Sequence, residues 1–155
     1  MLTCCNGGDA KQAPLLDATV AFPPRDTSHF SLPATTHHCT DGQTLLLEAV
    51  SPEGSGVLVR LHFRDSLGSG SYRVVMPGDS TAPAAVVAVR YLVRDVARAF
   101  VFDTGTVQLR REGAKVSGSI QGSGIENAIR TPTHIEYYDV PLPVATDTVS
   151  CAFQP

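Results

Sequence analysis

Tryptophan is absent from this chain of 155 residues, lysine occurs only at positions 11 and 115, and apolar runs are short. A transmembrane helix needs about 20 consecutive apolar residues, so the sequence predicts none. The formal net charge of −3 gives no electrostatic basis for binding nucleic acid. With four tyrosines and no tryptophan, any aromatic platform for stacking a sugar would be small.

The motifs of common catalytic and metal sites are also missing. The cysteines form no Cys-x-x-Cys pair, which argues against a zinc knuckle or a thioredoxin-type dithiol. No Gly-x-Ser-x-Gly occurs, and the glycine-rich run 118–124 lacks the Lys-Ser/Thr that follows a phosphate-binding loop. In a strand, adjacent His37 and His38 would point to opposite faces, so both could bind one metal ion only from a loop. We interpret them as solvated loop residues and not as metal ligands. The sequence therefore predicts no catalytic residue, metal ligand or cofactor.

Apolar and polar residues alternate most clearly between residues 105 and 122. Alternation with a period of two places one apolar row on a core and one polar row in water. A turn at 111–114 interrupts the pattern, and its Gly113 supplies the positive φ of a tight hairpin loop. The sequence predicts a β-hairpin here, with an apolar row formed by Val107, Leu109, Val116 and Ile120.

Further strands are expected at 45–50, 57–63, 72–76, 135–140 and 149–153, with a weaker candidate at 125–130. The stretch 84–102 permits two interpretations. Its apolar residues fall partly at helical spacing, whereas the alternation of Val87, Val89, Tyr91 and Val93 favours strands. Because β-branched residues are dense here, we favour two strands, about 85–93 and 97–102, that meet at Arg94-Asp95.

Short strands joined by glycine and proline turns predict an all-β fold, specifically an antiparallel β-sandwich, with a β-barrel as the alternative. Residues 1–26 contain three prolines and one short apolar patch, so we expect a signal remnant and flexible tether there, with an edge strand at 18–22 at most. Residues 29–41 are expected to form a polar loop. The antiparallel β domain is then predicted to span residues 27–155.

Two of the four cysteines lie near the two ends of this predicted domain. A disulfide between Cys39 and Cys151 would close a loop of about a hundred residues, for which the chain-entropy model gives roughly 4–5 kcal/mol of stabilisation. Such a bond indicates an oxidising compartment. The alternative is two unconnected buried thiols.

The other two cysteines, Cys4 and Cys5, precede Asn-Gly-Gly-Asp at the start of the chain. A small residue, a cysteine and a Gly/Asp tether are typical of the end of a bacterial lipoprotein signal. The charged and apolar regions of such a signal are missing, and Cys4 stands where glycine or alanine is usual if Cys5 carries the lipid. Lipidation of Cys5, or of Cys4, is thus one interpretation and chance resemblance is the other.

The hairpin, the Cys5-Asn-Gly-Gly-Asp opening and the late cysteine together resemble small bacterial cell-envelope lipoproteins of unknown function. The resemblance implies a tether followed by an antiparallel β-sandwich, located in the periplasm or at the cell surface. It implies no catalytic residues. Membrane attachment would occur only through the N-terminal lipid.

The leading functional hypothesis is a non-catalytic envelope protein that binds a partner protein, a glycan or a lipid. We predict that its binding surface includes Tyr72, Tyr91, Arg60 and Arg73. The first alternative is an extracytoplasmic hydrolase that acts from loops at the end of the sandwich. The second is a structural subunit of an envelope assembly that uses an exposed sheet edge for strand addition.

Overall fold

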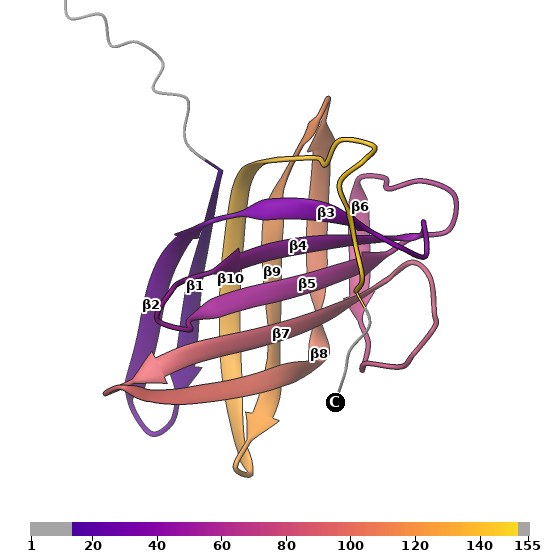
Figure 1. Ribbon diagram of the computed structural model, residues 1–155. Helices are drawn as coiled ribbons and strands as arrows, with labels where there is room; N and C mark the ends of the chain where they lie inside the picture. The colour runs from indigo at the N-terminus through magenta and orange to yellow at the C-terminus, as the bar shows by residue number, and fades with distance from the viewer. Residues whose placement is uncertain (1–13, 152–155) are drawn as a thin grey trace, which may run out of the picture.

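The computed structural model describes residues 14–151, which contain eleven β-strands and no helix (Figure 1). Accordingly, none of the described residues forms a helix that could cross a bilayer. The strands are β1 (Leu15–Phe22), β2 (Asp26–Pro33), β3 (Thr35–Cys39), β4 (Thr44–Val50), β5 (Gly56–His62), β6 (Gly70–Val74), β7 (Ala84–Val93), β8 (Val96–Glu112), β9 (Lys115–Glu126), β10 (Ile129–Pro141) and β11 (Thr148–Val149).

All of these strands belong to one sheet, in the order β11-β3-β4-β5-β7-β6-β8-β9-β10-β1-β2. Most neighbours are antiparallel, but β11 pairs with β3 and β6 pairs with β7 in parallel. The sheet curls into a half-barrel, so that β3, β4, β5 and β7 cross in front of β9 and β10 (Figure 1). The predicted all-β fold is confirmed. Two separate sheets of a sandwich are not seen, because the described strands form one continuous sheet.

The long strand β8 joins the two halves of the curled sheet. Its first part, Val96 to Val101, pairs with β7, while Phe102 to Glu112 pairs with β9. The register shifts between Phe102 and Thr104, which is the irregularity expected where a strand bends from one half to the other. A sequence pattern predicts strand faces but not two different partners for one strand, and this explains why two sheets were expected.

The core between the two halves is held by a chain of aromatic rings. Phe22 of β1 lies 5.8 Å from Tyr91 of β7, measured between ring centroids, and Tyr91 lies 6.0 Å from Phe100 of β8 in an edge-to-face arrangement. Phe100 stacks on Phe102 at 5.8 Å. Aromatic pairs in these geometries contribute about 0.5–1.5 kcal/mol each beyond the area they bury. The chain therefore ties β1, β7 and β8 to one another.

Glycines on the inner face of β9 make room for aromatic rings from the adjacent strands. A Cβ added at Gly122 would lie 2.5 Å from Cδ2 of Phe102, and one at Gly124 would lie 2.7 Å from Cδ2 of Phe100. A Cβ at Gly118 would lie 2.5 Å from the hydroxyl of Tyr137 in β10. The interpretation that glycines along a strand mark close approach of a neighbour applies to these three positions.

Several local predictions are confirmed. The hairpin turns between Glu112 and Lys115, with Gly113 at a φ of 60°. Residues 84–102 form two strands that turn at Arg94-Asp95, both of which have positive φ. The alternation on β5 also holds, since Val57, Val59 and Leu61 are buried while the residues between them face outward.

The predicted tether is wrong in its described part, residues 14–26, and the edge strand allowed at 18–22 is a longer inner strand. Strand β1 lies inside the sheet between β10 and β2, and its Leu16, Ala18 and Val20 are fully buried. The polar loop expected at 29–41 is likewise β2 and β3. Both segments are polar on one face because one face of the sheet is in water. Their many polar residues therefore resemble those of a loop. Cys4 and Cys5 lie outside the described residues.

Replacing Leu16 with alanine should lower the free energy of unfolding by roughly 2–5 kcal/mol, because it empties a fully buried site in the core. Leu15→Ala, on the opposite and half-exposed face of β1, is the matched control and should cost much less. Urea denaturation monitored by circular dichroism measures both. Equal, small effects would mean that β1 is dispensable for the fold.

Gly122→Ala should destabilise the protein by about 1–3 kcal/mol, because the new methyl group would overlap Phe102 and the backbone oxygen of Thr104. Gln121→Ala, at the neighbouring exposed position of β9, should change stability by about 0.5 kcal/mol or less. Thermal unfolding of the two variants separates crowding from a general effect of substitution in β9. A neutral Gly122→Ala would contradict the close ring approach.

Candidate functional site

An apolar groove lies on the outer face of the sheet, over β5, β7 and β8. Its volume is about 460 Å³. It includes two of the large apolar residues that the described structure leaves in water, since Val50 is 59% exposed and Leu58 is 37% exposed. An apolar patch of this kind is typical of a ligand or interaction site. The lining residues are Val50, Gly54, Gly56, Leu58, Ala88, Val89, Arg90, Ala99, Phe100 and Val101.

Strand register brings these residues together in two neighbouring rows. In the first row Leu58 pairs with Ala88, and Ala88 pairs with Val101. In the second row Val50 pairs with Gly56, Gly56 with Arg90, and Arg90 with Ala99, so that each row runs across the strands. Small residues alternate with large ones along both rows. The alanines and Gly56 form the floor, and the larger side chains form the walls.

Glycine is required at position 56 by close approach of the backbone. A Cβ there would lie 2.6 Å from the carbonyl oxygen of Ala49 and 3.2 Å from Cγ2 of Val50. Any side chain would therefore force β4 and β5 apart and would also fill the groove. The same glycine thus keeps the strands close and leaves the end of the groove open.

Arg90 is the only titratable residue that lines the groove. It is exposed, and within residues 14–151 its side chain forms no ion pair or hydrogen bond. A Cβ added at Gly54 would lie 3.5 Å from its Nε atom, so the turn between β4 and β5 runs alongside the guanidinium group. The groove therefore combines apolar walls with one cation that has no acidic neighbour in its lining.

The residues predicted to form a binding surface are not brought together. Tyr72 and Tyr91 are only 4% and 1% exposed, because both point into the core. The hydroxyl of Tyr72 donates to the carbonyl oxygen of Gly68 at 2.7 Å. Arg73 is exposed on β6, whereas Arg60 on β5 donates to the carbonyl oxygen of Cys151 at 2.8 Å. The prediction failed because aromatic residues on strands were assigned to the surface without knowledge of which face is buried.

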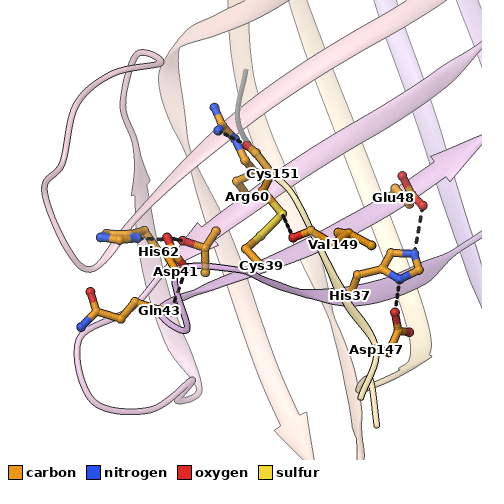
Figure 2. Close-up of a disulfide and its surroundings, with 11 residues drawn as sticks. His37, Cys39, Asp41, Gln43, Glu48, Arg60, His62, Asp147, Val149 and Cys151 are labelled. Atoms are coloured by element: carbon orange, nitrogen blue, oxygen red, sulfur yellow. Dashed lines mark hydrogen bonds and ion pairs between the residues drawn. A yellow bond between two sulfur atoms is a disulfide. The ribbon is translucent and has the colours of Figure 1, made fainter. Parts of the chain in front are cut away.

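The predicted Cys39–Cys151 disulfide is present and holds the C-terminal segment against β3 (Figure 2). Next to it, His37 lies between two carboxylates: its Nδ1 is 2.7 Å from Oδ1 of Asp147, and its Nε2 is 3.0 Å from Oε1 of Glu48. Both ring nitrogens must carry protons to satisfy both acceptors. The hydrogen bond with Asp147, aided by the Asp147 and Glu48 charges, raises the pKa of His37 above its ordinary value.

Two polar clusters resemble catalytic groups in composition but not in arrangement. The hydroxyl of Thr44 donates to Asp41 at 2.7 Å and lies 2.9 Å from Nδ1 of His62. In a hydrolase triad the histidine stands between the hydroxyl and the carboxylate, because it must accept the hydroxyl proton. Here the Thr44 hydroxyl lies between His62 and Asp41 and donates a hydrogen bond to Asp41. This cluster is therefore not arranged for nucleophilic attack.

The second cluster lies on the outer face of β1, β2 and β10. Asp17 accepts a hydrogen bond from Ser31 at 2.6 Å, and its two carboxylate oxygens lie 2.9 and 3.0 Å from Nε2 of His29. The hydrogen bond from Ser31 is the main cause that lowers the pKa of Asp17 below its ordinary value. No group of three or more His, Cys, Asp or Glu residues in the described part of the chain could hold a metal ion. In this cluster the carboxylate of Asp17, and not the histidine, lies between the other two groups, so it is not arranged as a catalytic triad either.

Comparison of the chain with protein-family models, with curated proteins and with solved structures gives no match. The groove was not identified from the sequence, although a signal for it exists. The segment 84–89, Ala-Ala-Val-Val-Ala-Val, is apolar at both odd and even positions. In an antiparallel sheet with one face in water, such a strand indicates an apolar outer face as well as an apolar inner one.

The stability contributed by His37 should depend on pH. A folded-state pKa above the unfolded value means that the contribution is complete below the unfolded pKa, about 6.5, and is lost as pH rises through the folded pKa. His37→Gln should therefore lower the melting temperature more at pH 5.5 than at pH 9. His38→Gln is the control, since His38 makes no side-chain hydrogen bond or ion pair among the described residues. A pH-independent effect of His37→Gln would contradict this assignment.

Proposed function

We propose that the protein is a non-catalytic, extracytoplasmic binding protein whose outer groove holds an acyl chain with an anionic end, such as a fatty acid. The observation that carries the proposal is the composition of the groove, in which apolar walls surround a single titratable residue, Arg90. This composition matches an amphiphile with one negative charge.

The apolar part of the groove favours an acyl chain over a glycan. Burying a methylene group contributes roughly 0.8 kcal/mol, and the groove volume of about 460 Å³ is in the usual range for small-molecule sites. Sugar hydroxyls placed against Leu58, Ala88 and Val101 would lose water without gaining hydrogen-bond partners, and each would incur a desolvation cost. Of the glycan and the lipid expected from the sequence, the lipid is therefore the one that the groove supports.

The charge of Arg90 supplies the polar end of the site. A guanidinium group binds a carboxylate through two parallel hydrogen bonds, and such charge-assisted bonds are stronger than those between neutral groups. No acidic residue lines the groove to compete for Arg90. An anionic end next to Arg90, with the chain lying along the row of Leu58, Ala88 and Val101, satisfies both parts of the site.

The disulfide between Cys39 and Cys151 supports the proposed location, since such bonds persist in oxidising compartments. A lipid anchor at Cys5 or Cys4 remains a prediction from the sequence. An extracytoplasmic site agrees with a ligand that is exchanged with a membrane or an envelope assembly.

Dodecanoate, kept below the concentration at which it forms micelles, should bind with a negative heat-capacity change, because apolar surface is buried. Arg90→Gln should weaken binding by roughly 10–100-fold, which corresponds to the loss of a charged hydrogen bond. Ala99→Trp should reduce binding further, because the indole would occupy the groove. Isothermal titration calorimetry at several temperatures measures all three effects.

Arg94→Gln is the matched control for charge, because Arg94 is an exposed arginine on the β7–β8 turn that does not line the groove. It should bind dodecanoate as the unaltered protein does. Dodecanol tests the role of the carboxylate. It should bind the unaltered protein more weakly than dodecanoate does, whereas Arg90→Gln should bind dodecanol and dodecanoate equally well. Absence of dodecanoate binding, or binding that neither groove variant changes, would refute the proposal.

A further inference from the structure

The two edges of the sheet are built differently. At one edge lies β11, a strand of two residues whose neighbourhood is tied to β3 by the disulfide. At the other edge lies β2, which has eight residues and, among the strands of residues 14–151, pairs with β1 only. Figure 1 shows β2 as the outermost strand of its half of the sheet. One side of the β2 backbone is therefore available for a further strand.

Strand β2 lacks most of the features that protect edge strands from pairing. Natural edges are guarded by lysine, by bulges or by charged residues that point inward. The register between β1 and β2 runs through eight consecutive pairs without a bulge. The only acidic residue, Asp26, and the only proline, Pro33, stand at the two ends of the strand. Between them His29 is the only titratable residue, and it is bound to Asp17.

The two faces of β2 restrict which strand could be added. Phe30 and Leu32 point inward and are partly buried against the core, whereas Thr27, His29 and Ser31 are exposed on the outer face. An added strand must continue both faces, so it needs apolar residues inside and polar residues outside, in the same phase. Strand β2 of a second copy meets this requirement. Its acidic residue is terminal, so two aligned copies bring no like charges to the centre.

We propose that β2 pairs antiparallel with β2 of a second copy around a two-fold axis at Phe30, so that the sheet continues through a dimer. Residues opposite each other in an antiparallel pair share a face. The axis at Phe30 then places the two Phe30 rings next to each other, Ser28 opposite Leu32 on the inner face, and Thr27 opposite Pro33 on the outer face. Such an interface is isologous and closes at two copies.

The test compares two lysine substitutions that differ only in the face they occupy. Ser28→Lys would place an ammonium group on the inner face opposite Leu32, and should weaken dimerisation at least tenfold. Thr27→Lys adds the same charge on the outer face, where it stays in water, and should dimerise like the unaltered strand. Cys4 and Cys5 are replaced by serine in every variant, so that no intermolecular disulfide can imitate the dimer. Sedimentation equilibrium over a range of concentrations measures the association.

Amide hydrogen exchange supplies a second readout that does not depend on the stability of the Ser28→Lys variant. Exchange of the amides of residues 27–32 should slow as the concentration of the unaltered protein rises, while amides in β9 should not change. A monomer at every accessible concentration would overturn the proposal. So would a dimer that Ser28→Lys and Thr27→Lys affect equally, or one that forms without protection in β2. These outcomes are independent of fatty-acid binding, since β2 does not line the groove.

Discussion

The fold depends on the contact between aromatic rings and glycine backbone inside the curl of the sheet. Phe100, Phe102 and Tyr137 come from the strands on either side of β9 and lie against its Gly124, Gly122 and Gly118. Without side chains at these points, β9 lets its neighbours approach and the sheet can bend sharply, as it does at the corners of barrels. Tyr91 of β7 then extends the aromatic chain to the other half of the sheet, and Phe22 of β1 contacts Tyr91 from the half that contains β9. The same contacts between rings and glycines thus produce both the curl of the sheet and the packing of its core.

The two edges of the curled sheet differ in how their backbone groups are covered. At the β3 end, short pairing with β11 is reinforced by the disulfide, by His37 between Asp147 and Glu48, and by the bond from Arg60 to Cys151. Apart from the contact between His37 and Glu48, these bonds join residues that are about a hundred positions apart, and they limit how far the edge can open. At the β2 end the main-chain groups have no such cover. A long, regular edge strand that is neither charged nor bulged at its centre is a ready template for pairing with another strand.

The sequence was sufficient to predict local structure, but not the position of each strand in the sheet or the face on which each side chain lies. The hairpin around Gly113 and the turn at Arg94-Asp95 follow from alternation and turn chemistry, and the disulfide follows from the positions of Cys39 and Cys151. Strand β1 was expected only as a possible edge strand at 18–22, because the prolines that flank it and its short apolar patch resemble a tether, although Leu16 packs in the core. Tyr72 and Tyr91 were placed on the surface because residue type does not reveal which face is buried. The joining of both halves through β8 depends on pairing between distant residues, which no local pattern contains.

The same argument explains why the groove can be inferred from alternation once the pairing is known. On β5 the outer positions Arg60 and His62 that follow Leu58 are polar, whereas on β7 the outer positions Val86 and Ala88 are apolar. Selection for stability alone would not retain this pattern, because outer apolar residues gain little from folding and promote association. The small side chains of Ala88 and Ala99, and Gly56 with none, leave a groove between the larger side chains of Leu58 and Val101. A hollow that is apolar, floored by small residues and bordered by one arginine is better explained by a bound amphiphile than by an incidental gap in packing.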